Sequence, residues 1–306
     1  MASLTTAVSA MGPGTTELVD LLVLLGMGAV VPLGLALVDE PGLARIRRLW
    51  PLAAVPGALS LWLPRGGDLA TGCALLYALG TLAVALHAPL RLARTRSLAP
   101  AEVAVLTALA APSVAGVAGV AERSGYPLFG FEPHILALTV PHFHYAGFTA
   151  ALVAGLVCRA ARPGSAPARC AALSVPAGTL LVLAGYFLGN WWQFAGAAVL
   201  TTGMWLVGLV TWRDLRPRTG DRTTARLLAA SSAVLALTML LALWWALGRA
   251  AGLPHPTLTW MAATHGVGNA LGFALCALLA WRRITADRTD ATRTDATRTD
   301  TTETPR

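Results

Sequence analysis

Long apolar runs, separated by short links that carry arginine, constrain the fold of this chain more than any motif does. Several runs reach about 20 residues, the length that an α-helix needs to cross the hydrocarbon core of a bilayer. Hydrophobic residues make up 56% of the chain and charged residues 12%, which is about half the charged share of a soluble domain. These runs predict an all-α, polytopic transmembrane helix bundle whose surface contacts the lipid bilayer.

About nine spans are predicted within a transmembrane domain at residues 17–283. Residues 1–16 form a short polar N-terminus, and residues 284–306 form a low-complexity tail in which Thr-Asp-Ala-Thr-Arg occurs twice. The tail has no apolar surface to bury, so we expect it to be disordered. The sequence leaves open whether the short second and sixth runs cross completely. We expect the spans near residues 17–38, 49–63, 69–90, 101–120, 134–158, 171–188, 191–212, a run that ends near 247, and 258–281.

All 23 basic residues are arginines, and their distribution alternates from link to link. The links after the first, third, fifth and seventh spans hold three, three, three and five arginines, whereas the links between them hold one, one, none and one. The positive-inside rule then places the N-terminus outside and the C-terminus in the cytoplasm. The net charge of +8 follows from this topology and indicates no nucleic-acid partner. Absence of lysine, with abundant Ala, Gly and Leu, is typical of a GC-rich bacterial genome, so we expect a multi-pass protein of the bacterial plasma membrane.

Two histidines lie one residue apart within the fifth apolar run, in Pro-His-Phe-His-Tyr-Ala-Gly-Phe at 141–148. An imidazole in hydrocarbon loses its hydration and needs a partner or a wet cavity. At about 100° per residue, His142, Tyr145 and Thr149 share one face of a helix, whereas His144 lies on the opposite face. Because both faces are polar, we expect this span at the centre of the bundle.

A second intramembrane polar pair, His265 and Asn269, lies in the last apolar run. The two residues are four apart and share a helix face with two glycines, whose small size lets another helix approach closely. His265 and His142 are both about 10 to 12 Å below the predicted outer surface, at ~1.5 Å per residue. The fifth and last spans are therefore expected side by side, with His142 or His144 near His265.

Most other polar residues near the membrane lie toward the predicted outer end, including Glu122 in the link before the fifth span. The inner half is apolar apart from His87, so the sequence predicts a cavity open to the outer leaflet or periplasm. Each candidate also has a structural interpretation: an acidic residue favours a helix N-terminus, a tryptophan anchors at the interface, and a buried histidine bridges two helices. The candidate catalytic residues are His142, His144, His265, Tyr145 and Glu132, and the candidate substrate contacts are Asn269, Glu17, Asn190, Trp192 and Thr149.

No metal ion or other cofactor is predicted. The two histidines of a His-x-His sequence diverge on a helix, and the chain has neither His-x-x-x-His nor His-x-x-Glu. A metal site built from the three intramembrane histidines is the less favoured interpretation. The four cysteines form no Cys-x-x-Cys pair and are expected to act as small apolar residues.

Three stretches resemble the YndJ-like family of bacterial integral membrane proteins. They are His-Phe-His-Tyr-Ala-Gly-Phe at 142–148, His-Gly-x-x-Asn-x-x-Gly-Phe at 265–273 and Pro-Leu-x-Gly-Phe at 127–131. The resemblance covers at least residues 120–275, and some members of that family are longer. It implies a bacterial integral membrane protein and supports the importance of the motifs, but it implies no particular reaction.

The residues favour a membrane-embedded enzyme that performs acid–base chemistry, isomerisation or cyclisation, on a lipophilic substrate such as a terpenoid or an epoxide. In this hypothesis His142 or His144 is the acid or base, and Tyr145 and Asn269 position the substrate. The alternative is a transporter or permease, with or without proton coupling, which needs polar groups at both ends of a path. A third hypothesis is a membrane-bound scaffold, for which buried histidines are unnecessary. The sequence does not fix the oligomeric state.

Overall fold

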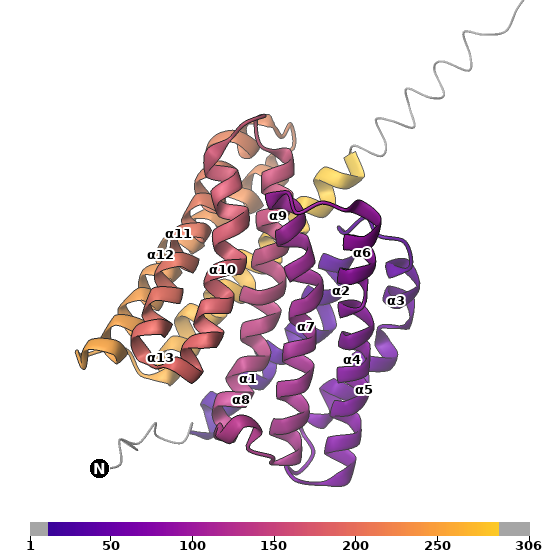
Figure 1. The fold of residues 1–306 in the computed structure, drawn as a ribbon, viewed down its shortest axis with the longest axis vertical. Coiled ribbons are helices and arrows are strands. Elements are labelled where there is room, and N and C mark those ends of the chain that lie inside the picture. Colours follow the sequence, from indigo (N-terminus) through magenta and orange to yellow (C-terminus); the bar gives the residue numbers. More distant parts are fainter. Residues whose placement is uncertain (1–11, 288–306) are drawn as a thin grey trace, which may run out of the picture.

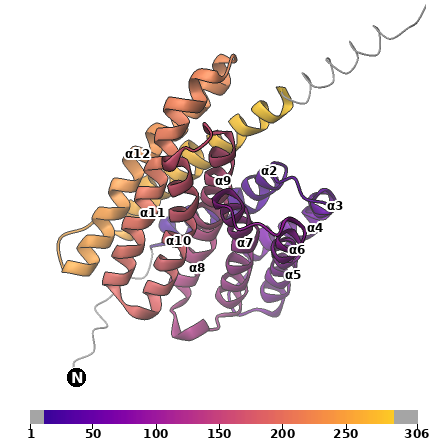
Figure 2. The ribbon, with the colours of Figure 1, turned by 45° about the horizontal axis from the view of Figure 1, so that its top comes forward.

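The computed structural model describes residues 12–287, which form a bundle of helices without any strand (Figures 1 and 2). Eight helices in this part of the chain are long and apolar enough to cross a membrane, and a shorter apolar helix adds a ninth. The predicted all-α polytopic bundle is therefore confirmed. Which end faces the cytoplasm stays a prediction from the arginine distribution.

Three of the eight long spans are single α-helices, one joins two α-helices, and four combine α-helical and π-helical segments in series. The spans, in chain order, are α1 (Pro13–Leu25) with η1 (Gly26–Val30) and α2 (Val31–Leu35); α5 (Asp68–Ala85) with α6 (His87–Thr95); α7 (Pro100–Ser124); α8 (Pro133–His142) with η3 (Phe143–Thr149) and α9 (Ala150–Ala160); α10 (Ala166–Leu188); α11 (Asn190–Val210) with η4 (Thr211–Leu215) and the 3₁₀ turn η5 (Arg216–Arg218); α12 (Arg222–Ala251); and α13 (Leu258–Met261) with η6 (Ala262–Gly266) and η7 (Gly268–Leu275).

The second crossing is short because it is broken into α3 (Leu43–Leu49) and α4 (Pro51–Ser60), which meet at Trp50. The chain contacts Arg91 just before α3 and Arg123 just after α4. These two arginines lie near opposite ends of α7, so the broken segment leads from one end of the bundle to the other (Figure 1). The expected second span is thus present, with ten residues in its apolar helix.

The span α8–η3–α9 occupies the centre of the bundle. It is the most enclosed of the eight spans, with 72% of its apolar window buried, and it packs against η1, α7 and α10. The expectation that the span with two polar faces would be central is met. The last span begins beside α12 and passes obliquely behind the bundle to the opposite end (Figures 1 and 2).

The ends of several helices differ from the sequence-based boundaries. The first helix begins at Pro13, and the last continues to Asp287, beyond the expected end of the span at 281 and of the transmembrane domain at 283. Helix α7 extends to Ser124, so Glu122 lies on a helix and not in a link. The predicted disordered tail lies largely at 288–306, and the predicted polar N-terminus lies largely at 1–11; both ranges are outside the described residues.

Both histidine motifs adopt π-helix, in which hydrogen bonds join residues five apart. The first motif coincides with η3, which follows Pro141 directly, and the second with η6 and η7. Proline has no backbone N–H and cannot continue the α-helical hydrogen-bond ladder. The wider turn changes which side chains share a face, with consequences for the site.

Candidate functional site

A cavity of about 260 Å³ opens among six spans, toward the end of the bundle where α8 begins and α10 ends. Its wall is mainly apolar, with side chains of Leu, Val, Met, Ala and Phe. Within it, His142 and Tyr145 come from the central span, whereas His265 and Asn269 come from the last. The two predicted motifs therefore face one cavity, although more than a hundred residues separate them. The remaining polar or aromatic side chains of the wall are Thr139, Tyr186, Gln193 and Trp245.

The imidazole of His142, in the cavity wall, has a ring nitrogen without a hydrogen-bond partner in the described residues. Its Nε2 atom is buried and has no hydrogen-bond partner in the described part of the chain. The ring meets that of Phe143 edge to face, with centroids 5.8 Å apart. Leaving a buried polar atom unpaired costs about 1–3 kcal/mol. Such an atom beside a cavity suits a bound molecule that supplies the missing partner.

His265 is held in one tautomer by its surroundings. Its Nδ1 lies 2.8 Å from the backbone oxygen of Thr238 on α12. Because a carbonyl oxygen only accepts, Nδ1 must carry the proton, and Nε2 of the neutral ring keeps its lone pair. The side-chain nitrogen of Asn269 lies 3.2 Å from that Nε2, and the Thr238 hydroxyl donates to the Asn269 oxygen at 2.9 Å. Thr238 thus positions both polar groups of the last span.

Tyr145 connects the cavity wall to the first span. Its hydroxyl donates to the backbone oxygen of Leu22 at 2.7 Å. The nearby indole N–H of Trp50 donates in the same way to the oxygen of Met27, at 2.7 Å. The Leu22 oxygen also accepts the backbone N–H of Gly26, so the Tyr145 hydroxyl is its second donor. The hydroxyl proton of Tyr145 is therefore already used in a hydrogen bond, and toward the cavity this hydroxyl can act only as an acceptor.

His144 points away from the cavity, against α5. Its Nε2 lies 2.6 Å from the hydroxyl of Tyr77, and Nδ1 has no partner in the described residues. The ring packs where Gly26 of η1 has no side chain: a Cβ there would lie 2.2 Å from Nδ1. Thr149 is also fully buried, and its hydroxyl donates to the His144 oxygen five residues earlier, at 2.9 Å. The expected stripe of His142, Tyr145 and Thr149 is thus incomplete, because the π-turn rotates Thr149 out of the cavity wall.

The family model of the YndJ-like proteins matches residues 21–273, a range that includes both motifs and every residue of the cavity wall except Val19.

The chain belongs to the YndJ-like family. Over 234 residues it is 28% identical to the uncharacterized membrane protein YndJ of Bacillus subtilis (strain 168), an alignment that covers 76% of this chain and 41% of the relative. The chain thus spans about two fifths of the length of this curated relative. No solved structure matches the chain.

Membership of the YndJ-like family and the eight long apolar helices make this chain a multi-pass protein of the bacterial membrane. The family match agrees with the resemblance that the motifs carry. It assigns no reaction, so the chemistry of the cavity has to be argued from its own residues.

Besides His144 and Thr149, four predicted site residues of the YndJ-like chain lie outside the cavity wall. Glu132 is the exposed residue that precedes α8, and Glu17 is exposed on α1. Trp192 is exposed at the start of α11. Asn190 donates from its side chain to the backbone oxygen of Arg249 at 3.1 Å, which ties the start of α11 to the end of α12.

Sequence reasoning missed Thr238, whose backbone oxygen holds His265, and Tyr77, whose hydroxyl contacts His144. Each is a hydrogen-bonding residue within an apolar span, and that is the only signal the sequence offers. It also missed a small cavity of about 20 Å³ between Asp20, Tyr77 and the ion pair of Glu122 with Arg123. This volume suffices for one water molecule.

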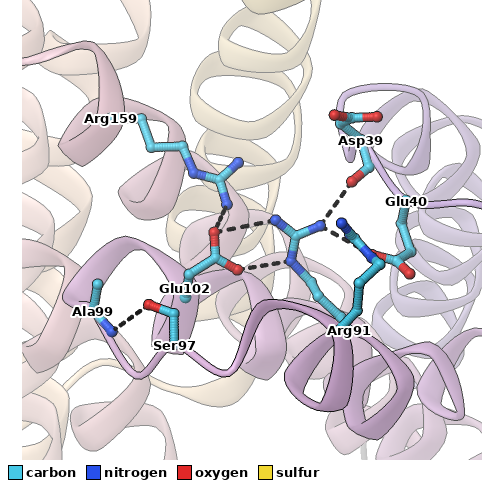
Figure 3. A network of polar contacts seen from close by, with 8 residues as sticks. Asp39, Glu40, Arg91, Ser97, Ala99, Glu102 and Arg159 are labelled. Carbon is cyan, nitrogen blue, oxygen red and sulfur yellow. Dashed lines mark hydrogen bonds and ion pairs between the residues drawn. The ribbon is translucent and has the colours of Figure 1, made fainter.

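A buried ion network closes the opposite end of the bundle (Figure 3). The guanidinium of Arg91 donates to Glu102 at 2.8 Å, to Glu40 at 3.1 Å and to the backbone oxygen of Asp39 at 2.7 Å. Arg159 at the end of α9 donates to the same Glu102 at 2.5 Å. Since these charges satisfy one another, we assign the network to structure and not to the candidate site.

Proposed function

We propose that the protein is a membrane-embedded enzyme that performs acid–base chemistry on a lipophilic molecule held in the cavity. One observation carries the proposal: His142 and His265, from distant spans, line the same mainly apolar cavity. Histidine is the side chain best suited to move protons near neutral pH. A helix-bridging role would pair the two imidazoles with protein groups, yet Nε2 of His142 has no such partner in the described residues.

The size of the cavity favours a compact apolar molecule or the apolar part of a larger one. An apolar cavity of about 150 Å³ accommodates benzene. The volume here is about 260 Å³, enough for a larger hydrocarbon group. Apolar walls exclude water, which protects a carbocation-like or enol-like intermediate from side reactions.

The two histidines suit complementary roles. His265 keeps a lone pair on Nε2 because Thr238 fixes its Nδ1–H, and it can accept a proton there once the Asn269 amide, 3.2 Å from that nitrogen, turns aside. His142 in its protonated form would donate a proton to a double bond or to an epoxide oxygen. Removal of a proton from a neighbouring carbon by His265 then gives an isomerised or cyclised product, and the reaction consumes no proton overall. Asn269 and Tyr145 are positioned to orient the molecule.

Isotope transfer from water tests this chemistry directly. Wild type and the variants His142→Ala and His265→Ala would be expressed in a host grown in partly deuterated water, and extracted lipids would be compared by mass spectrometry. The expected result is a product that appears with wild type and disappears with both variants. Protonation of a double bond would leave carbon-bound deuterium in that product, whereas protonation of an epoxide oxygen would leave only exchangeable deuterium. His87→Ala is the matched control, because His87 lies beside Gly42 at the opposite end of the bundle.

Two outcomes contradict the enzyme hypothesis. A chemical inventory that is identical in all four strains rules out the chemistry, provided that each variant is folded in the membrane. An unchanged inventory whose distribution across the membrane depends on His142 favours a transporter instead.

A further inference from the structure

Arg249, near the end of α12, is a cation without a described counter-ion beside the cavity. It follows the cavity-lining Trp245 by four residues and Ala246 by three, so it lies on the same helix face, about one turn farther out. Its guanidinium carbon lies 5.5 Å from the ring centre of Trp245. Its Nε atom is buried and has no hydrogen-bond partner in the described residues.

The other two arginines at this end are neutralised. Arg65 and Arg123 both pair with the buried carboxylate of Glu122. No carboxylate lies within ion-pair distance of Arg249 in the described part of the chain. A partly buried guanidinium at the edge of the hydrocarbon region is costly without an anion.

We propose that Arg249 binds the anionic head group, a phosphate or carboxylate, of an amphipathic ligand whose apolar part fills the cavity. The proposal deepens the proposed function and rests on the same cavity. A guanidinium matches both anions because its planar N–H groups donate in pairs. The ring face of Trp245 contacts the guanidinium of Arg249, and Trp245 also lines the cavity. The proposed head-group site is therefore adjacent to the apolar cavity.

Matched ligands with and without charge test the proposal. Purified full-length protein in nanodiscs of zwitterionic lipid would be titrated with geranyl phosphate, with geraniol and with inorganic phosphate, and the affinities would be measured by calorimetry. Arg249→Gln is expected to weaken geranyl phosphate binding by about tenfold to a hundredfold, the loss of a charge-assisted hydrogen bond, and to leave geraniol binding unchanged. Arg47→Gln on the exposed face of α3 controls for net charge.

Thermal unfolding of each variant confirms folding, and Arg249→Lys tests geometry because it keeps the charge but loses the paired N–H groups. Equal affinity of wild type and Arg249→Gln for geranyl phosphate overturns the proposal, as does failure of wild type to bind it. Arg249-dependent binding of inorganic phosphate as tight as that of geranyl phosphate also overturns it, since the site would then serve a free anion. Head-group binding without any product that depends on His142 and His265 would retain this proposal and reject the enzyme.

Discussion

The hydroxyl oxygen of Tyr77 lies 2.6 Å from Nε2 of His144, and neither residue is more than 1% exposed. Trp50 packs edge to face on Tyr77, with ring centroids 5.8 Å apart, and its indole N–H reaches the first span. The contacts link four spans through one histidine. They give His144 a structural role in orienting η3, whereas His142 faces the cavity from the same segment.

Tyr77→Phe should destabilise the protein by about 1 to 2 kcal/mol, because it leaves both ring nitrogens of His144 buried without a partner. Tyr126→Phe is the control, since Tyr126 is 62% exposed. The free energy of unfolding in detergent, measured for both variants, checks the difference. Equal stability of the two variants would show that the Tyr77 hydroxyl does not hold His144.

Gly26→Ala should be destabilising by about 1–3 kcal/mol through overpacking, because the new methyl group would collide with the His144 ring. Gly28→Ala offers a control in the same π-helical segment, since a Cβ there meets no atom within 4 Å. Thermal unfolding compares the two. A stability loss that is the same at both positions would attribute the effect to the backbone and not to His144.

Arg91→Met should destabilise the protein by about 1.5–3 kcal/mol, because Glu40 and Glu102 each lose one of their two arginine partners and keep only Arg94 and Arg159, respectively. Arg226→Met, on the exposed part of α12, should have little effect. Unfolding free energies check the contrast. If the two substitutions cost the same, the network of Figure 3 contributes no net stability.

Acidic pH should destabilise the first turn of α12. The hydroxyl and backbone amide of Thr224 donate to Asp221 and hold the pKa of that carboxyl below its usual range. Since the folded pKa is below the unfolded value of about 4, this stabilisation is fully present above pH 4 and is lost as the pH falls through the folded pKa. Amide hydrogen exchange at residues 222–226, after correction for intrinsic rates, should accelerate in that acidic range. Asp221→Asn keeps a capping oxygen and should remove the acid dependence.

The helix bundle was predictable because burial of apolar runs in the membrane and placement of arginines in the links leave regular patterns in the sequence. Apolar runs of membrane length and alternating arginines define the number of crossings, and even Pro51 and Pro56 mark the short second one. Burial of the central span followed from polar residues on two faces. These features depend on composition and spacing, which a sequence displays directly.

Four of the ten candidate site residues line the cavity, and the directions of the side chains were not predictable from the sequence. His142, His265, Tyr145 and Asn269 do share a cavity, whereas the direction of His144 depends on a partner 67 residues earlier in the chain. A period of 3.6 residues misplaces Thr149 because η3 is a π-helix. Pro141 indicates an irregular helix, but no local sequence pattern predicts that the turn after it would be a π-helix.

A π-turn is an α-turn with one surplus residue, and η3 therefore makes the length of the central span part of the site. Deleting one residue from 146–149 would allow the α-helical ladder to close. Every side chain from Ala150 onward would then turn by about 100° relative to His142. The face of α9 that packs against α7 would no longer be in phase with the histidine that lines the cavity. For this protein, the count of residues between two contacts matters as much as their identity.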